Sequence, residues 1–549
     1  MQFQVWLQPD WQRAFPADRP GSTRRLELWA ARGERVAFQV CVRHDHPGIL
    51  PVTIAVQAPA GLQVQVRRVG SVPVAHHTEG SPLESRDGRL PGFVPDVLFP
   101  TATARAPAGE VLAFWVTVEV APSATAGRKT IRLAATLGEG KTCRTERLSC
   151  DIQVAPVTLQ RRRDFHVTHW FYADALADWY GVAPFSKGFW PICARYMRNV
   201  AEHGGDTIYV PVFTPPLDGV KRPTQLLHVT RLGKDRYRFD WRAVRQWIKT
   251  AKAAGITHFE WAHLFTQWGV KYALRIYHEQ GGDERLLWPS TTGATSPTYR
   301  KFLAQFLPAL KQFLDHEGLL KNSFFHLSDE PHGAEALEGY RAARKLLREL
   351  APWMQVMDAL SDIEYGRQKL TDIPIPSIRT ALDFKAEGIP SWCYYCCSPT
   401  GRFTNRFLDT PLPNVRAQGW LFYRHGFGGF LHWGYNYWYL RQTRRLIDPF
   451  AVSDAHAWPG WAYGDPFMVY PGGGVAGAGG PGSGEGHEDG PLDSIRWEVF
   501  AAGLQDYALL QTLGVEPSDK RLRSFQTFEE FPRAGRAIPA LRAALLSTL

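Results

Sequence analysis

The sequence predicts two units of different fold class, an N-terminal β-sandwich followed by a (β/α)8 TIM barrel with C-terminal helices. Apolar and polar residues alternate along the first 156 residues, and short apolar runs then alternate with helical patterns. Pro156 stands where the pattern changes. Because 549 residues exceed one ordinary domain, we predict a sandwich over 1–156, a catalytic barrel over 157–515 and a helical extension over 516–549.

The sandwich is predicted from period-two alternation, in which Val, Ile and Thr recur between polar residues, as in half-buried strands. Turn-forming pairs such as Ala60-Gly61 and Asp87-Gly88 separate the segments. Short strands at this spacing are typical of a β-sandwich. The alternating segments are 24–30, 36–42, 52–56, 62–66, 114–120, 130–136 and 148–154.

The barrel is predicted from β-then-α units. The candidate strands are 166–170, 207–213, 258–264, 323–328, 355–358, 377–382, 392–397 and 429–435. The helical patterns between them include 187–203, 242–254, 299–316 and 335–350, and those at the end of the chain are 494–513 and 537–549. Gly255 and Gly318 stand where C-terminal helix glycines belong. The Gly-rich segment 471–486 lacks Gly-Lys-Ser/Thr and is predicted to be a flexible loop.

Composition and charge exclude several classes of protein. The net charge of +10 is spread along the chain, and its one tight basic run, 161–163, is far short of a nucleic-acid arm. No apolar stretch approaches a membrane span, and the N-terminus lacks a signal-peptide pattern, so we expect a cytoplasmic protein. The seven cysteines are an odd number and do not suggest a disulfide framework. The 20 Trp residues favour flat apolar platforms, which sugars and bases both use.

The most informative segment is 324–332, in which an aromatic strand leads into Asp329, Glu330 and Pro331. The C-terminal ends of barrel strands form the active face, so both carboxylates are catalytic candidates. Pro331 is expected to keep Glu330 extended. Since neighbouring strand residues point to opposite faces, the chain must then twist or bulge at Asp329 if both are to face one ligand. The alternative is that Asp329 caps the next helix and Glu330 is solvated.

Glycoside hydrolysis normally needs two carboxyl groups beside the scissile bond. The predicted seventh and eighth strands end without a carboxylate and offer Tyr394, Tyr395, Trp433, Tyr435 and Asn436 instead. A missing nucleophile is consistent with substrate-assisted catalysis, in which the 2-acetamido oxygen of the sugar attacks C1. That mechanism needs one carboxylate to polarise the amide and another to protonate the leaving oxygen.

Several motifs together resemble glycoside hydrolase family 123, part of the group labelled domain of unknown function 4091. They occupy 32–39, 326–331, 392–399, 430–436, 465–472 and 494–507. The resemblance implies an exo-acting N-acetyl-β-galactosaminidase that retains configuration and forms an oxazolinium intermediate. It also implies that Asp329 polarises the acetamide and that Glu330 is the general acid/base.

Candidate sugar-binding groups lie near other strand ends, where aromatic rings stack on pyranose faces. They are Trp170, Tyr209, Trp261, His263, His326, Asp358, Tyr395, Trp433, Tyr435 and Asn436. Asp358 is equally compatible with a helix cap. Arg496 and Asp506 are interpreted as structural ion-pair or capping groups. Cys393, Cys396 and Cys397 lack a second ligand pair and are interpreted as core cysteines, so we predict no metal and no cofactor.

The leading hypothesis is a β-N-acetylhexosaminidase, most specifically a β-N-acetylgalactosaminidase, with a carbohydrate partner and neither nucleic acid nor membrane. One alternative is a glycosidase for a sugar without an acetamide, which would recruit Glu260 or Asp358 as its second carboxylate. The other is a non-catalytic carbohydrate-binding barrel, against which the intact pair of Asp329 and Glu330 argues. The sequence leaves the sugar epimer, the linkage and the oligomeric state open.

Overall fold

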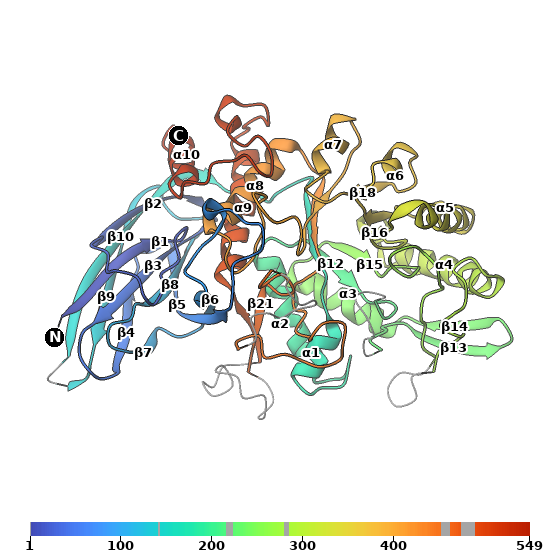
Figure 1. Ribbon diagram of the computed structural model, residues 1–549, viewed down its shortest axis with the longest axis horizontal. Helices are drawn as coiled ribbons and strands as arrows, with labels where there is room; N and C mark the ends of the chain where they lie inside the picture. The colour runs from blue at the N-terminus through green and yellow to red at the C-terminus, as the bar shows by residue number, and fades with distance from the viewer. Residues whose placement is uncertain (1, 141–142, 216–222, 279–284, 452–461, 474–488) are drawn as a thin grey trace.

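The computed structural model describes residues 2–140, 143–215, 223–278, 285–451, 462–473 and 489–549 (Figure 1). Ten strands form two five-stranded sheets in the N-terminal part. The first has the order β1 (Phe3–Pro9), β3 (Arg35–His44), β8 (Leu112–Val120), β5 (Leu62–Val74), β6 (Gly92–Phe99). The second has the order β2 (Arg25–Arg32), β10 (Arg144–Thr158), β9 (Gly127–Leu137), β4 (Leu50–Gln57), β7 (Thr103–Ala106). The predicted N-terminal strands are therefore present, and the domain boundaries stay a prediction.

The two sheets enclose one apolar core. Phe38 and Phe114 from the first sheet and Ile131 and Ile152 from the second are fully buried in the same cluster. Alternation along the strands explains this core, because every second side chain points to the same face. Strands β2 and β10 pair in parallel, whereas the other pairs in these sheets are antiparallel.

The closed eight-stranded barrel predicted for the second unit is wrong. The described parallel strands form one six-stranded sheet and one separate pair, β17 (Met357–Ala359) with β18 (Ile373–Ile375). The six-stranded sheet has the order β16 (Ser323–Phe325), β15 (His258–Trp261), β12 (Thr207–Val210), β11 (His166–His169), β20 (Gly429–His432), β19 (Cys393–Tyr394). Isolated bridges at Phe325–Val356 and Ser377–Tyr394 lie between the two sheets. Strands β17, β18 and β19 have only two or three residues each, too few for a continuous ladder of backbone hydrogen bonds.

The predicted strand at 377–382 is also wrong. A helix, α7 (Ala381–Ala386), occupies its last two residues, and the strand lies earlier, at β18. Pro374 and Pro376 flank Ile375 in the sequence. Because proline lacks the N–H that a ladder needs, the apolar alternation there does not resemble an ordinary strand.

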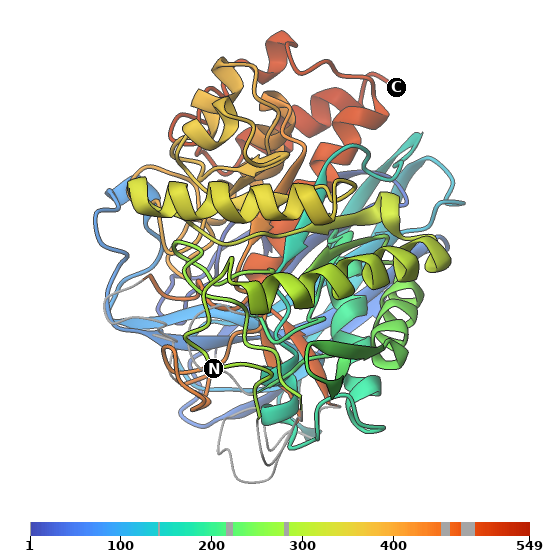
Figure 2. The same ribbon diagram turned by 90° about the vertical axis from the view of Figure 1, so that its right-hand side faces the viewer.

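Helices pack around the parallel sheet, and Figure 2 shows α4 and α5 running across its outer side. The helices are α1 (Ala173–Trp179), α2 (Phe189–Glu202), α3 (Arg242–Ala254), α4 (Pro297–Glu317), α5 (Gly333–Leu350), α6 (Glu364–Arg367), α8 (Leu412–His425), α9 (Ile495–Thr512) and α10 (Ala537–Leu546), besides α7. As predicted, α3 and α4 end at glycines with positive φ, +100° at Gly255 and +64° at Gly318. No helix among the described residues is long and apolar enough to cross a membrane.

Two hairpins complete the fold. One is β13 (His228–Gly233) with β14 (Arg236–Asp240), and the other is β21 (Val469–Gly472) with β22 (Gly490–Asp493). The second hairpin contains the start of the Gly-rich segment predicted at 471–486. Residues 474–486 of that segment lie outside the described residues.

Buried ion pairs join the sandwich to the C-terminal helices. Asp506 of α9 accepts hydrogen bonds from Arg416 of α8 and from Arg542 of α10. Arg416 also pairs with Asp10, at 3.0 Å, and Arg542 also pairs with Glu34. These charges are almost fully buried, so each needs its partner to offset desolvation.

A second buried pair has the same role. Arg496 of α9 pairs at 3.1 Å with Asp96 of the sandwich strand β6, and both side chains are fully buried. Arg496 and Asp506 therefore occupy structural ion pairs, as interpreted from the sequence, but with different partners.

Candidate active site

The two adjacent carboxylates lie between β16 and α5. Asp329 is 6% exposed and Glu330 is half-buried. Helix α5 begins after His332 without a side-chain capping bond, so the predicted alternative of Asp329 as a helix cap does not occur. Backbone hydrogen bonds instead fix the segment: the Trp268 N–H donates to the Asp329 carbonyl at 2.8 Å, and the Glu330 N–H donates to the Ala359 carbonyl at 2.9 Å.

The backbone of Glu330 is left-handed, with φ of +40°. The prediction that Pro331 would keep Glu330 extended is therefore wrong. The bond from the Glu330 N–H to β17 holds the turn in place and thus overrides the local preference. A left-handed conformation costs a non-glycine residue about 1–2 kcal/mol. Such strain clusters at functional sites, where the surrounding structure maintains it.

Tyr394 of β19 contacts the carboxylate pair. Its hydroxyl donates a hydrogen bond to Glu330 Oε1. Burial and the nearby Glu330 carboxylate raise the pKa of Tyr394 well above its usual value, so the hydroxyl stays protonated. The neighbouring Tyr395 points to the opposite side and donates to Gln418 of α8. The predicted sugar-binding residue Tyr395 is thus directed away, and Tyr394 takes the place beside Glu330.

Tyr209 of β12 lies on the other side of the pair. Burial, together with the charges of Glu260 and Asp329, raises its pKa well above the usual value. Its hydroxyl contacts His263 Nδ1 at 3.1 Å. Burial and the nearby His326 lower the pKa of His263, so that ring is neutral and accepts a hydrogen bond from the Tyr209 hydroxyl. Tyr209 and His263 therefore lie at this end of the sheet, and their role in sugar binding stays a prediction.

Three groups form a buried chain beneath the pair. The His326 ring contacts Glu260 through Nε2 at 2.6 Å and Asp358 through Nδ1 at 3.1 Å. All three side chains are inaccessible to solvent. Burial lowers the pKa of His326, but hydrogen bonds to Asp358 and Glu260 outweigh it and raise the pKa to about 9. An imidazolium between two carboxylates donates from both ring nitrogens.

Each carboxylate of this chain has further donors. Glu260 accepts hydrogen bonds from the Thr168 hydroxyl and from Trp170 Nε1, the latter at 2.7 Å. Trp170, a predicted sugar-binding residue, is therefore tied to Glu260.

Asp358 accepts the backbone N–H groups of Leu327 and Ser328, at 3.1 and 3.2 Å, and the Tyr340 hydroxyl at 2.5 Å. It thereby fixes the two residues that precede Asp329. Asp358 is neither an exposed sugar ligand nor a helix cap, two of the roles considered from the sequence.

Asp465 is a residue whose role the sequence did not reveal, although it opens one of the motifs. It accepts Trp433 Nε1 at 2.8 Å and contacts His432 Nε2 at 3.2 Å. Burial raises its pKa to about 7, against the effects of Trp433 and Arg406. The contact with Cys397 and burial raise the pKa of Cys396, and the charges of Asp465 and Glu330 add to this rise. Trp433 is held in place by Asp465, and its role in sugar binding stays a prediction.

The structure places three other predicted residues elsewhere. Trp261 donates to Ser323 and stacks on Phe325, on the face of the sheet opposite to Glu260. Tyr435 donates to Asn199 of α2. Asn436 binds both backbone groups of Tyr172, at 2.9 and 3.0 Å, and so fixes a loop. The three side chains are buried structural groups, and we leave them out of the site.

The site thus has adjacent carboxylates at the C-terminal edge of a parallel sheet, with tyrosine and tryptophan beside them. This arrangement is typical of a glycoside hydrolase. The comparisons agree. The model of the glycoside hydrolase 123 catalytic domain matches residues 170–513, more than half of the chain. The chain belongs to glycoside hydrolase family 123 and is a glycoside hydrolase.

Solved structures extend the likeness to the whole fold. A family 123 glycoside hydrolase from Clostridium perfringens, solved in a study of glycolipid glycan hydrolysis, is similar with a TM-score of 0.73 and 12% identity. The match covers 100% of this chain and 97% of that one. At this identity the likeness shows the fold alone.

Two further structural matches are much weaker. An Ig-like-domain-containing GH10 xylanase from termite gut has a TM-score of 0.31 and 8% identity, covering 88% of this chain and 100% of that one. A β-glucuronidase of Parabacteroides merdae has a TM-score of 0.30 and 10% identity, covering 85% and 50%. Comparison with curated protein sequences gives no match.

Proposed function

We propose that this glycoside hydrolase is a retaining, exo-acting β-N-acetylhexosaminidase, and specifically a β-N-acetylgalactosaminidase. Glu330 protonates the glycosidic oxygen as the leaving group departs, and it later deprotonates the incoming water. Asp329 orients and polarises the 2-acetamido group, whose oxygen attacks C1 and forms an oxazolinium. Water then opens this ring at C1 and restores the acetamide.

The observation that carries the proposal is the left-handed turn at Glu330. In an extended strand, Asp329 and Glu330 would point to opposite faces. With φ of +40°, the chain changes direction between them. The charge of Asp329 contributes to the raised pKa of both Tyr394 and Tyr209, which come from strands on either side. This supports one ligand-facing pair rather than one buried and one solvated group.

The states of the other carboxylates argue against a glycosidase with a protein nucleophile. Glu260 and Asp358, the two alternatives considered from the sequence, are fully buried and bound to His326. An attack on C1 would require either group to leave its donors. Asp465, with a pKa near 7, is partly protonated at neutral pH and hence a weak nucleophile.

A non-catalytic carbohydrate-binding protein is also less well supported. Binding alone does not require the strained conformation of Glu330, and nothing would then favour its retention. The Tyr394 hydroxyl that donates to Glu330 Oε1 fixes the orientation of this carboxyl group, which a positioned proton donor requires.

The proposed substrate rests on the acetamide requirement of the proposed mechanism and is supported by family membership. We infer a terminal β-linked N-acetylgalactosamine. The Clostridium perfringens relative is described as hydrolysing glycolipid glycans, and a glycan of that kind is the natural substrate class to test.

A panel of 4-nitrophenyl β-glycosides tests the proposal. The glycosides of N-acetylgalactosamine and N-acetylglucosamine are compared with those of galactose and glucose, which differ in the 2-substituent. Hydrolysis restricted to the acetamido sugars, with the galacto epimer preferred, is the expected result. Comparable hydrolysis of galactose or glucose would overturn the substrate-assisted mechanism, and no hydrolysis of any β-glycoside would overturn the proposed activity.

A further inference from the structure

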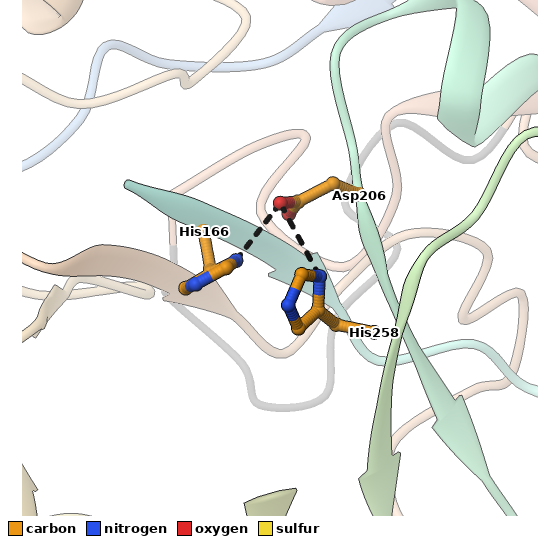
Figure 3. A group of neighbouring side chains, drawn as sticks. All are labelled: His166, Asp206 and His258. Atoms are coloured by element: carbon orange, nitrogen blue, oxygen red, sulfur yellow. Dashed lines mark hydrogen bonds and ion pairs between the residues drawn. The ribbon is translucent and has the colours of Figure 1, made fainter. Parts of the chain in front are cut away.

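A second cluster of chemically active side chains lies at the opposite end of the parallel sheet. His166 is the first residue of β11, His258 is the first residue of β15, and Asp206 directly precedes β12. Figure 3 shows the two imidazole rings and the carboxylate converging from three neighbouring strands. This is the N-terminal edge, whereas Asp329 and Glu330 lie beyond the C-terminal edge.

The two oxygens of Asp206 have different surroundings. Oδ1 accepts the Val167 N–H at 2.8 Å and lies 4.0 Å from the Arg162 guanidinium. Oδ2 faces the two imidazoles, 2.9 Å from His166 Nδ1 and 3.9 Å from His258 Nδ1. The protein thus satisfies one oxygen and directs the other toward two nitrogen atoms.

We propose that His166, Asp206 and His258 bind a divalent transition-metal ion, chemically best matched by Zn²⁺. Two imidazole nitrogens and one carboxylate oxygen are a donor set that zinc uses, and neither Mg²⁺ nor Ca²⁺ favours nitrogen. The ligand atoms all lie within 4.8 Å of one another. In tetrahedral zinc with bonds near 2.0–2.1 Å, ligand atoms are about 3.4 Å apart. The observed separations of 2.9 and 3.9 Å lie on either side of that value.

The surroundings orient both rings. The His166 ring stacks on Trp392, with centroids 5.7 Å apart. The Asn322 Nδ2 lies 3.3 Å from His258 Nε2, the nitrogen that carries the proton when Nδ1 is a ligand. Metal binding therefore requires the Asn322 amide to turn its oxygen toward Nε2, where the oxygen accepts that proton.

An ion has a route to the cluster. The three side chains are 16–23% exposed. Asp206 also lines a cleft of 1150 Å³, together with Arg161, Arg162 and residues of the sandwich and of helices α2 and α9. The site is therefore open to exchange rather than sealed.

The neighbouring charges have opposing effects on metal binding. Burial, with His166 and Arg161 nearby, lowers the pKa of His258 and keeps its ring in the neutral form that binds metal. Arg161 and Arg162 repel a cation, so binding is weaker than in a site lined by carboxylates. The fourth position is left to solvent, as in exchangeable three-ligand sites.

The metal would stabilise the fold without joining the hydrolysis. It would fasten the starts of β11, β12 and β15 to one another. A strand of four residues separates its two ends by about 10 Å. Stability should therefore respond to the metal, while turnover should not.

Zinc titration of the full-length, metal-stripped protein tests the proposal. One equivalent of Zn²⁺ should bind, and a saturating excess should raise Tm by about 2–4 °C. His258→Ala and Asp206→Asn should lose both effects. His316→Ala is the matched control, since His316 is an exposed histidine of α4 (76%) and should behave as wild type.

X-ray absorption at the zinc edge of the wild-type complex is independent of the folding of any variant. Two imidazole ligands with one or two oxygen ligands are expected. Failure of the wild type to bind one equivalent, a spectrum without imidazole ligands, or full binding by folded His258→Ala would each overturn the site. Hydrolase activity does not enter these measurements, so the outcome is separate from that of the proposed function.

Discussion

The hydroxyl of Tyr394 donates its hydrogen to Oε1 of Glu330, from β19 to the turn after β16. Strands β16 and β19 are the two edges of the six-stranded parallel sheet, and β17 and β18 lie between these edges, joined to them by isolated bridges. A tyrosine in this position holds the Glu330 carboxyl group in one orientation. In the proposed mechanism, Oε2 then delivers the proton to the leaving oxygen.

Removing that hydroxyl should slow hydrolysis. Tyr394→Phe loses a hydrogen bond to a charged group, which is worth about 1.5–3 kcal/mol, so kcat/KM should fall about 10–100-fold. Tyr395→Phe is the matched control, because the Tyr395 hydroxyl is directed at Gln418, away from the pair. Steady-state kinetics on an aryl N-acetylgalactosaminide compare the two variants. Equal losses in both would argue that the tyrosines affect only the fold.

Replacing Glu330 should reveal its role through the leaving group. Glu330→Gln cannot donate a proton, so the rate should fall on the order of 10²–10⁴ for poor leaving groups. Activated aryl groups such as 2,4-dinitrophenyl need no proton and should be affected much less. Rates of the glycosylation step are measured with both kinds of substrate. An equal loss for both would remove Glu330 from the acid role.

Replacing Asp329 should abolish substrate assistance. A thiazoline mimic of the oxazolinium resembles an intermediate close to the transition state and should inhibit the wild type strongly. Asp329→Asn should lose activity and most of that inhibition, because the neutral side chain at position 329 no longer stabilises the positive charge that develops on the oxazolinium. Inhibition constants and turnover are measured in parallel. An unaffected Asp329→Asn enzyme would refute the mechanism.

The charge on His326 should make stability depend on pH. Its pKa is raised from 6.5 to about 9 in the folded protein. A raised pKa means that this contribution is fully present below about pH 6.5 and is lost as pH rises through about 9. Tm should therefore decline between pH 7 and pH 9.5, and less steeply in His326→Gln. A wild-type NMR titration that shows His326 neutral at pH 7 would contradict this, whether or not the variant folds.

Stereochemistry tests the absence of a protein nucleophile. Two successive displacements at C1, by the acetamide oxygen and then by water, return the β configuration. Direct attack by water would need a base about 6.5–9.5 Å from Glu330. Proton NMR of the first-formed sugar, recorded before mutarotation, should show the β-anomer. An α-anomer would exclude the proposed mechanism.

The sequence was most informative where a local pattern has one structural solution. Helix 242–254 was predicted to the residue, because its apolar period ends at Gly255. Strands β1, β6 and β7 were missed, and the closure of the barrel was wrong. Strands of two or three residues such as β17 and β19 are too short to show a period, so only tertiary contacts determine how they pair.

The site was predicted in part for a similar reason. Asp329 and Glu330 stand out because a strand leads into them, but the left-handed turn depends on a bond to Ala359, which no local pattern reveals. Choosing Tyr395 over Tyr394 was an error of one residue, and in a strand one residue reverses the face. Likewise, the buried contacts of Glu260 and Asp358 with His326 join residues far apart in sequence.

The ion pairs between the sandwich and the final helices bear on whether the protein is modular. Glu34 and Asp10 belong to one unit, while Arg416, Arg542 and Asp506 belong to the other. The sandwich expressed alone would leave Asp10 and Glu34 without their arginine partners, and each broken buried pair costs about 3–5 kcal/mol. Neither the sandwich nor the hydrolase unit can therefore be exchanged for a foreign counterpart that lacks the matching set of charges.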